Sequence, residues 1–327
     1  MKLILGFCTL LLLISCEVDA PIIKHYKLEI PEGFPEIKYP SDNLPTAKRV
    51  ALGKRLFFDP ILSKDSTISC NSCHFQEYAF ADNKAVSPGV ENAMGNRNAM
   101  SLANLAYADF LLREGGVPTL EMQVLVPIQD HNEMDFNIVR VAERMQLDAT
   151  YRAQSIEAYN REPDSFVITR AIAAFERTLL SGRSNYDKNR MTGEERKGKA
   201  LFFSDSLACS SCHGTFLFTN QEIENNGLYR QYPDSGTYIL THLQEDIGKF
   251  KVPTLRNIEL TAPYMHDGSV SNLEDVISHY ESGGKGHFNQ SPVLKGFALN
   301  SEEKANLIAF LFSLTDEDFI SNSNFVQ

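Results

Sequence analysis

Two copies of one short pattern carry the most specific chemistry in this chain: two cysteines separated by two residues and followed directly by a histidine. The first copy is Cys70-Asn-Ser-Cys73-His74, and the second is Cys209-Ser-Ser-Cys212-His213. Two thiols at this spacing can add to the two vinyl groups of one porphyrin, and the adjacent histidine then lies under the iron as an axial ligand. The sequence therefore predicts two covalently attached c-type haems.

Three other uses of paired cysteines explain these patterns less well. A thioredoxin-like dithiol needs one C-x-x-C and no following histidine, and a zinc site of four cysteines would leave both histidines without a role. Disulfides between cysteines three positions apart would stabilise the fold little, because the loop that each one closes is so short. Two haems account for all six residues.

The segments that precede the two patterns also resemble each other. Leu52-Gly-Lys-Arg-Leu-Phe-Phe58 comes before the first, and Lys197-Gly-Lys-Ala-Leu-Phe-Phe203 comes before the second, which indicates a duplicated haem domain. We expect a mainly α fold of two cytochrome c-like haem domains, residues 17–185 and 186–327, with few strands. Apolar periodicity and capping residues predict helices over residues 46–57, 137–159, 165–181, 192–203, 271–281 and 301–314.

The composition narrows the classes of partner. Hydrophobic residues make up 43% of the chain and charged residues 22%, as in a soluble globular protein. The formal net charge of -11 argues against nucleic acid, because binding to phosphate requires clustered Lys and Arg. An acidic surface suits a basic redox partner, and it equally suits simple solubility.

The first 16 residues, MKLILGFCTLLLLISC, have the pattern of a secretory signal: a basic residue, a short apolar run and small polar residues. The end of this segment, Leu13-Ile-Ser-Cys16, resembles a bacterial lipobox, in which the cysteine becomes the lipidated first residue. We therefore predict a periplasmic or cell-envelope protein, held at a membrane only by a lipid anchor on Cys16. The alternative is an ordinary signal peptide that is cleaved a few residues later.

A series of further motifs runs through the mature chain beside the two haem patterns. They are Leu56-Phe-Phe-Asp59, Arg97-Asn98 with Asn104, Gln123, Pro127-Ile128, Glu133-Met134, Val252-Pro-Thr-Leu-Arg-Asn257 and Pro263-Tyr-Met-His-Asp-Gly268. In this order they resemble the bacterial di-haem cytochrome c peroxidases and the related MauG enzymes over nearly the whole mature chain. The resemblance implies a peroxidatic haem in the N-terminal domain, an electron-transfer haem in the C-terminal domain and one calcium ion between them, with calcium contacts at Asn98, Thr261 and Pro263.

The same resemblance places Glu133 and Gln123 in the distal pocket above the peroxidatic haem. A carboxylate there can take a proton from one peroxide oxygen and return it to the other, which makes water the leaving group. A buried carboxyl beside haem should have a raised pKa, whereas the amide of Gln123 can only orient peroxide by hydrogen bonding.

Both predicted distal ligand positions depart from those of typical cytochrome c peroxidases. Where those peroxidases carry a distal histidine on the peroxidatic haem, this chain has Val90, which cannot bind iron, so we expect an open iron site that needs no prior reduction. His131 is the only histidine near this position. On the C-terminal haem the resemblance places the ligand at Tyr280, as in MauG, rather than at the methionine of the peroxidases. The alternatives are that the adjacent His279 or Met265 is the ligand, or that Tyr280 is only a packed aromatic residue of a helix.

A third departure concerns the path between the haems. The family usually places a tryptophan ten residues before the distal glutamine, but this chain has Arg113 there and no tryptophan at all. Tyr107 or Phe110 are candidates for the relay, and weaker coupling of the haems is the other explanation.

The main hypothesis is an enzyme that reduces hydrogen peroxide to water with electrons from a small cytochrome c or cupredoxin. The second is peroxide-dependent oxidation of a partner protein, as in MauG, which the open site and Tyr280 favour. A non-catalytic di-haem electron carrier is the third, but it gives no purpose to Glu133, and Val90 argues against it.

Overall fold

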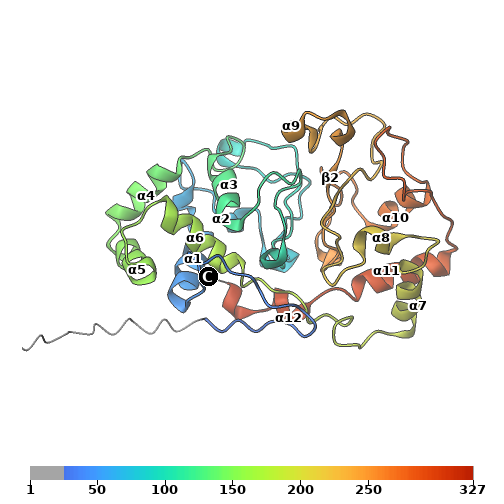
Figure 1. Ribbon diagram of the computed structural model, residues 1–327, viewed down its shortest axis with the longest axis horizontal. Coiled ribbons are helices and arrows are strands. Elements are labelled where there is room, and N and C mark those ends of the chain that lie inside the picture. The colour runs from blue at the N-terminus through green and yellow to red at the C-terminus, as the bar shows by residue number, and fades with distance from the viewer. Residues whose placement is uncertain (1–25, 327) are drawn as a thin grey trace, which may run out of the picture.

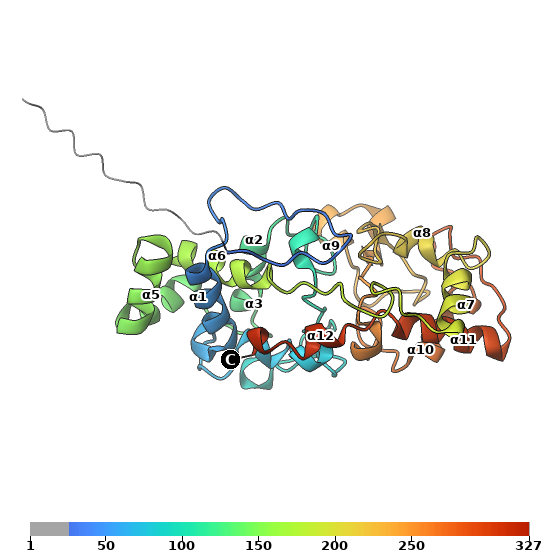
Figure 2. The ribbon, with the colours of Figure 1, turned by 90° about the horizontal axis from the view of Figure 1, so that it is seen from below.

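The computed structural model describes residues 26–326 as two mainly helical lobes that lie side by side along the long axis (Figures 1 and 2). The mainly α prediction is confirmed, whereas residues 1–16 and Cys16 lie outside the described part of the chain. The α-helices are α1 (Ala47–Phe58), α2 (Leu120–Gln123), α3 (Leu125–Gln129), α4 (Ile138–Leu147), α5 (Ala149–Tyr159), α6 (Ser165–Glu176), α7 (Gly193–Phe202), α8 (Cys209–His213), α9 (Tyr238–Thr241), α10 (Leu273–Glu281), α11 (Ser301–Phe312) and α12 (Glu317–Ile320).

Short elements complete the described chain. Two two-residue strands, β1 (Ile223–Glu224) and β2 (Phe250–Lys251), pair in antiparallel fashion. Within residues 26–326, no helix is both long enough and apolar enough to cross a bilayer. Single turns of 3-10 helix span Pro60–Leu62, Cys70–Ser72, Gln76–Tyr78, Val90–Asn92, Leu105–Tyr107, Gln244–Asp246, Ile258–Leu260 and Ser323–Phe325.

The long helix predicted over residues 137–159 is two helices, α4 and α5, with Asp148 between them. Asp148 has extended backbone angles, and its carboxylate accepts hydrogen bonds from the amides of Thr150 and Tyr151 at 2.8 and 2.9 Å. An aspartate that caps the first turn in this way starts a new helix rather than continuing the old one. The apolar periodicity alone did not reveal this break.

Each lobe is built around one crossing of two helices, and a glycine makes each crossing close. A Cβ atom on Gly53 of α1 would lie 1.8 Å from the carbonyl oxygen of Ala171 in α6. A Cβ atom on Gly198 of α7 would lie at the same distance from the carbonyl oxygen of Asn306 in α11. Only glycine permits such an approach, which explains the glycine shared by the two repeated segments.

Equivalent phenylalanines pack beside the two crossings. In the N-terminal lobe the Phe57 ring contacts Phe175 and Phe80, with ring centroids 5.2 and 6.0 Å apart. In the C-terminal lobe Phe202 contacts Phe310 and Phe218 at 5.1 and 6.0 Å. Buried aromatic clusters with edge-to-face contacts stabilise a core beyond their area. The two lobes therefore share one construction, as the repeated sequence predicts.

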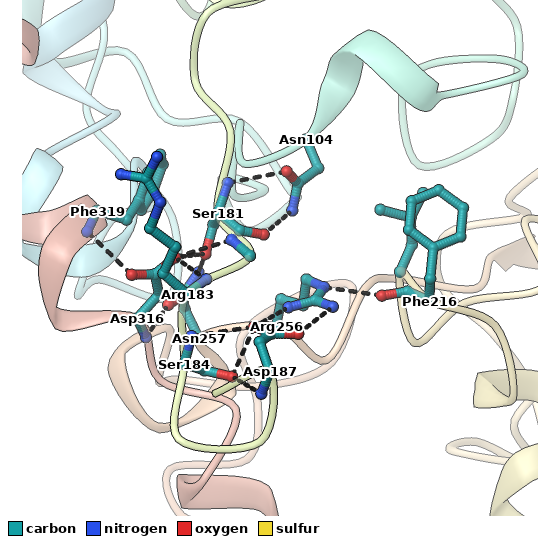
Figure 3. A network of polar contacts seen from close by, with 12 residues as sticks. Asn104, Ser181, Arg183, Ser184, Asp187, Phe216, Arg256, Asn257, Asp316 and Phe319 are labelled. Atoms are coloured by element: carbon teal, nitrogen blue, oxygen red, sulfur yellow. Dashed lines mark hydrogen bonds and ion pairs between the residues drawn. The ribbon is translucent and has the colours of Figure 1, made fainter. Parts of the chain in front are cut away.

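The link between the lobes, residues 181–187, is held by the buried carboxylate of Asp316 (Figure 3). One of its oxygens accepts hydrogen bonds from the hydroxyl of Ser181 and from the amides of Gly182 and Arg183, at 3.1, 2.8 and 2.9 Å. A buried carboxylate is costly unless it is hydrogen-bonded, so these donors stabilise the bend of the chain at the link.

Side chains from both lobes reach the same link. Asn104 donates to the carbonyl oxygen of Ser181 at 2.8 Å, and Asn257 donates to the Ser181 hydroxyl at 2.9 Å (Figure 3). Arg256 is 2% exposed and forms a two-point ion pair with Asp187. The predicted domain boundary between residues 185 and 186 falls inside this link.

The end of the chain returns to the N-terminal lobe, where α12 lies to the lower right of α1 and α6 in the view of Figure 1. The rings of Phe319 and Phe325 pack on Phe80 at 5.6 and 6.2 Å. The amide of Gln76 also donates to the carbonyl oxygen of Phe319 at 3.0 Å. The last residues of the predicted 186–327 domain thus contribute to the core of the other lobe.

Candidate functional site

Each lobe encloses a cavity beside its cysteine and histidine pattern. The N-terminal cavity has a volume of about 300 Å³ and is lined by Cys70, Cys73 and His74. The C-terminal cavity has a volume of about 550 Å³ and is lined by Cys209, Cys212 and His213. Apolar side chains make up most of the remaining walls of both cavities, as expected for a site that holds a flat, largely hydrophobic group.

The two histidines are oriented by equivalent hydrogen bonds. The Nδ1 atom of His74 lies 2.8 Å from the carbonyl oxygen of Phe80, and Nδ1 of His213 lies 2.8 Å from that of Phe218. A carbonyl only accepts, so Nδ1 carries the proton and Nε2 keeps its lone pair for a metal. Burial lowers the pKa of His74 and lowers the pKa of His213 to about 4, which favours the same neutral form.

The thiols also fit covalent attachment of haem. Cys70, Cys73, Cys209 and Cys212 are all free thiols, the form that covalent attachment of haem requires. Within the described chain, no group of three or more His, Cys, Asp or Glu side chains has the geometry of a metal site, so no four-cysteine zinc site is formed there. Free thiols, an oriented histidine and an apolar cavity together make the residues present fit one haem in each lobe.

Glu133 and Gln123, the predicted catalytic pair, both line the N-terminal cavity with His74. Glu133 is exposed and borders the cavity. Desolvation by the surrounding protein raises the pKa of Glu133 to about 7, and the nearby Asp130 carboxylate adds to the shift. The carboxyl is therefore poised to gain or lose a proton near neutral pH.

The loop with Val90 packs against the loop with Glu133. The amide of Val90 donates to the carbonyl oxygen of Glu133 at 2.8 Å, and a Cβ atom on Gly89 would lie 2.1 Å from the carbonyl oxygen of Asn132. Among the described residues that line the cavity are Gly89 and Asn132, but not Val90 or His131. His131 instead lies at the surface, where it pairs with Asp135.

In the C-terminal lobe, Tyr280 lines the same cavity as His213. The adjacent His279 is not among the described residues of the cavity wall, and its Nε2 atom lies 2.9 Å from the carbonyl oxygen of Asn226. Met265 does line the cavity, but its sulfur accepts a hydrogen bond from the Asn226 amide at 3.2 Å. Burial raises the pKa of Tyr280 to about 12, so its hydroxyl keeps its proton unless a metal replaces it.

Two residues that the sequence analysis did not single out also line these cavities. Glu176, at the end of α6, lies in the wall of the N-terminal cavity, and its buried Oε2 atom has no hydrogen-bond partner in the described chain. Burial raises the pKa of Glu176 to about 8. Lys251 lines both cavities, and burial lowers its pKa to about 8. The sequence did hold one signal for Glu176, because it is the single carboxylate in the otherwise mostly apolar segment 165–176.

The three predicted calcium contacts come from two loops, which meet where the amide of Asn98 donates to the carbonyl oxygen of His266 at 2.8 Å. Thr261 turns its hydroxyl toward the carbonyl oxygen of Ile258, 3.4 Å away, and Pro263 follows a cis peptide bond. The structure therefore brings Asn98 close to the loop that carries Thr261 and Pro263. The oxygens of Asn98, however, already accept hydrogen bonds from the guanidinium of Arg113.

The two aromatic candidates for the relay lie in different surroundings. Tyr107 packs against Phe34 and Phe216, with ring centroids 5.7 and 5.5 Å apart, and so reaches the segment that follows His213. Phe110 lies under the ammonium group of Lys251, 5.0 Å from its ring centre. Neither aromatic residue is part of the described wall of either cavity.

Two cavities, each with two free thiols and an oriented histidine, define a protein of the di-haem c type. The chain belongs to the di-haem cytochrome c peroxidase family, which includes MauG, and this membership implies two haem c groups. A family model described as di-haem cytochrome c peroxidase matches residues 47–196.

Several individual proteins are similar along most of the chain. The methylamine utilization protein MauG of Methylophilus methylotrophus is 31% identical over 297 residues, which cover 88% of each chain. The cytochrome c551 peroxidase of Nitrosomonas europaea is 33% identical and covers 83% of this chain and 81% of its own. The crystal structure of a MauG-like protein associated with microbial copper homeostasis matches with a TM-score of 0.88 and 34% identity, over 92% of this chain and 98% of that one.

Proposed function

We propose that this protein reduces hydrogen peroxide to water in the N-terminal lobe, with electrons that arrive through the C-terminal lobe. The observation that carries the proposal is that His74, Glu133 and Gln123 line one cavity, while His213 and Tyr280 line the other. One site thus has a proton-transfer group, and the other has Tyr280 as a second residue that could bind iron. The reaction consumes two electrons and two protons for each peroxide and yields two waters.

Glu133 moves the proton in this proposal. Haem bound at His74 would supply the iron that takes one peroxide oxygen and the electrons that break the O–O bond. Glu133 accepts the proton of the inner peroxide oxygen and returns it to the outer one, so that water rather than hydroxide leaves. The raised pKa of Glu133, about 7, suits both steps near neutral pH.

Gln123 and Val90 have supporting roles. The Gln123 amide can donate to peroxide and accept from it, but it cannot exchange a proton, so it orients the substrate. Valine offers no metal ligand, and the buried Val90 is fixed through its amide to the loop of Glu133. We therefore infer an iron site that is open to peroxide before the second haem is reduced.

A steady-state assay tests the open site. Holoprotein that has never been pre-reduced is mixed with peroxide, and turnover is followed by the oxidation of reduced cytochrome c. We expect full turnover from the first seconds, with no lag. Turnover that appeared only after reduction of the C-terminal haem would contradict the open site, while the peroxidase proposal itself would stand.

A second candidate function is peroxide-dependent oxidation of a partner protein, and the presence of Tyr280 in the C-terminal cavity favours it. A phenolate ligand stabilises oxidised iron far better than a thioether does, so oxidising equivalents could be held there. Mass spectrometry of cell-envelope proteins after peroxide addition, with the Glu133→Gln variant as control, separates the two functions. Rapid turnover with a reduced cytochrome or cupredoxin supports the first, and a new oxidised residue that needs Glu133 supports the second.

The cellular setting that we propose follows from the first 16 residues and from charge. Export as a lipoprotein would place the folded body in the periplasm or cell envelope, with residues 17–185 as the peroxidatic domain and 186–327 as the electron-transfer domain. The net charge of -11 suits a small basic electron donor. Metabolic labelling with palmitate tests the anchor: label in the wild type that is lost in a Cys16→Ala variant supports it.

A further inference from the structure

Arg113 lies between the two haem cavities and lines both of them. Its Nη2 atom donates to the carbonyl oxygen and to the Oδ1 atom of Asn98, at 3.0 and 2.8 Å, and its Nε atom lies 3.2 Å from the same carbonyl oxygen. Asn98 is only 7% exposed. The residue that the family resemblance assigns to calcium therefore already faces a cation that belongs to the chain.

The segment that carries Arg113 joins the two lobes at this point. The neighbouring Glu114 pairs with Arg97, which also pairs with Asp234 of the C-terminal lobe. The carbonyl oxygen of Arg113 itself accepts a hydrogen bond from the amide of Lys251 in β2, at 2.7 Å. The backbone of Arg113 is thus held by Lys251 of the C-terminal lobe, and its side chain binds Asn98 of the N-terminal lobe. An ion bound between two domains has the same structural role.

Among the described residues no carboxylate is in direct contact with Arg113, and the nearby Asp267 only partly offsets the burial of its charge. Within residues 26–326, Arg113 forms no ion pair, in contrast to the neighbouring Arg97. Burial lowers the pKa of Arg113 to about 10, so the guanidinium remains charged at neutral pH. A buried cation is stable only with a counter-charge, and haem carries two propionate carboxylates that can supply one in each cavity.

We propose that Arg113 takes the place of the calcium ion: its guanidinium is an internal cation that ties Asn98 to the contact between the lobes and is shared by the two haem sites. Calcium bound to the same oxygens would lie next to a buried like charge, which a low-dielectric site strongly disfavours. One residue then accounts for two departures, the absent tryptophan and the altered calcium site. The inference holds whichever substrate the protein uses.

The calcium content of the holoprotein is the first test. The protein is dialysed against calcium-free buffer, and its calcium is measured by mass spectrometry of the elements. Haem absorption spectra and thermal stability are then recorded with EGTA and with added calcium chloride. We expect substoichiometric calcium and no change in either property. One calcium per chain, or a spectral change with EGTA that calcium reverses, would overturn the proposal.

The reduction potentials of the two haems are the second test, because a purely structural side chain would not move both. A fixed cation stabilises reduced iron, so Arg113→Gln should lower both potentials, and Arg113→Lys should restore most of the shift. The exposed Arg183, which pairs with Glu29, gives a matched control, because Arg183→Gln removes the same charge far from the cavities. Unchanged potentials in Arg113→Gln would refute the shared cation. If Arg113→Gln does not fold, the calcium content of the wild type decides the question.

Discussion

The backbone amide of Val90 donates a 2.8 Å hydrogen bond to the carbonyl oxygen of Glu133. This contact joins two loops that are more than forty positions apart in the sequence: one holds the candidate acid–base residue, and the other holds the position that the family resemblance assigns to a distal ligand. Because the bond uses only backbone atoms, it does not depend on which side chain stands at position 90. Acid–base function and ligand choice can therefore be tested separately.

Glu133→Gln should reduce peroxide turnover by roughly a hundredfold to ten-thousandfold, the usual contribution of a positioned acid–base group. The amide has the same shape but cannot carry the proton. We expect both haem spectra to remain as in the wild type, because Glu133 holds no haem. Steady-state kinetics and absorption spectra are the measurements, and a fully active variant would remove Glu133 from the mechanism.

The pH dependence of turnover should report the same carboxyl group. The pKa of Glu133 is raised to about 7, so the neutral acid predominates below that value and cannot accept the peroxide proton. We therefore expect kcat/KM for peroxide to rise with pH through about 7 and then level off. In Glu133→Gln the residual rate should lack this inflection, and an inflection that survived the substitution would assign it to another group.

Tyr280→Phe should change the absorption spectrum of the C-terminal haem and raise its reduction potential, because an anionic ligand that stabilises oxidised iron is lost. His279 offers the matched control, since its ring nitrogen is bonded to the carbonyl oxygen of Asn226 and lies outside the cavity wall. We expect His279→Gln to leave the spectrum unchanged. The reverse pattern would identify His279 as the ligand, and a change only in Met265→Leu would identify Met265.

Gly198→Ala should destabilise the C-terminal lobe by about 1–3 kcal/mol, in the range of other overpacked sites. The new methyl group would lie 1.8 Å from the carbonyl oxygen of Asn306, so α7 and α11 would have to separate. Gly193→Ala is the control, because nothing lies within 4 Å of the position of its Cβ atom. Denaturant unfolding of the two variants measures the difference, and equal stability of the two would show that the crossing tolerates the methyl group.

The sequence predicted more of the fold than of the contacts between the lobes. All four helices that cross at Gly53 and Gly198 were expected from their periodicity, and the repeated segments predicted that the lobes would be alike. The split at Asp148 was not foreseen, because an aspartate inside an amphipathic pattern can be a surface residue or a cap, and only the backbone angles distinguish the two. The return of Phe319 to the N-terminal core left no local signal either.

For the candidate sites, the sequence by itself predicted where haem attaches, because that chemistry depends on residues adjacent in the chain, from Cys70 to His74 and from Cys209 to His213. Only the tertiary structure decided which distant side chains share a cavity or a charge. It placed Glu176 in a cavity wall, turned His279 away from the other cavity and directed the guanidinium of Arg113 onto Asn98. The physical reason is that burial, desolvation and hydrogen bonding depend on neighbours in space, which short sequence patterns do not encode.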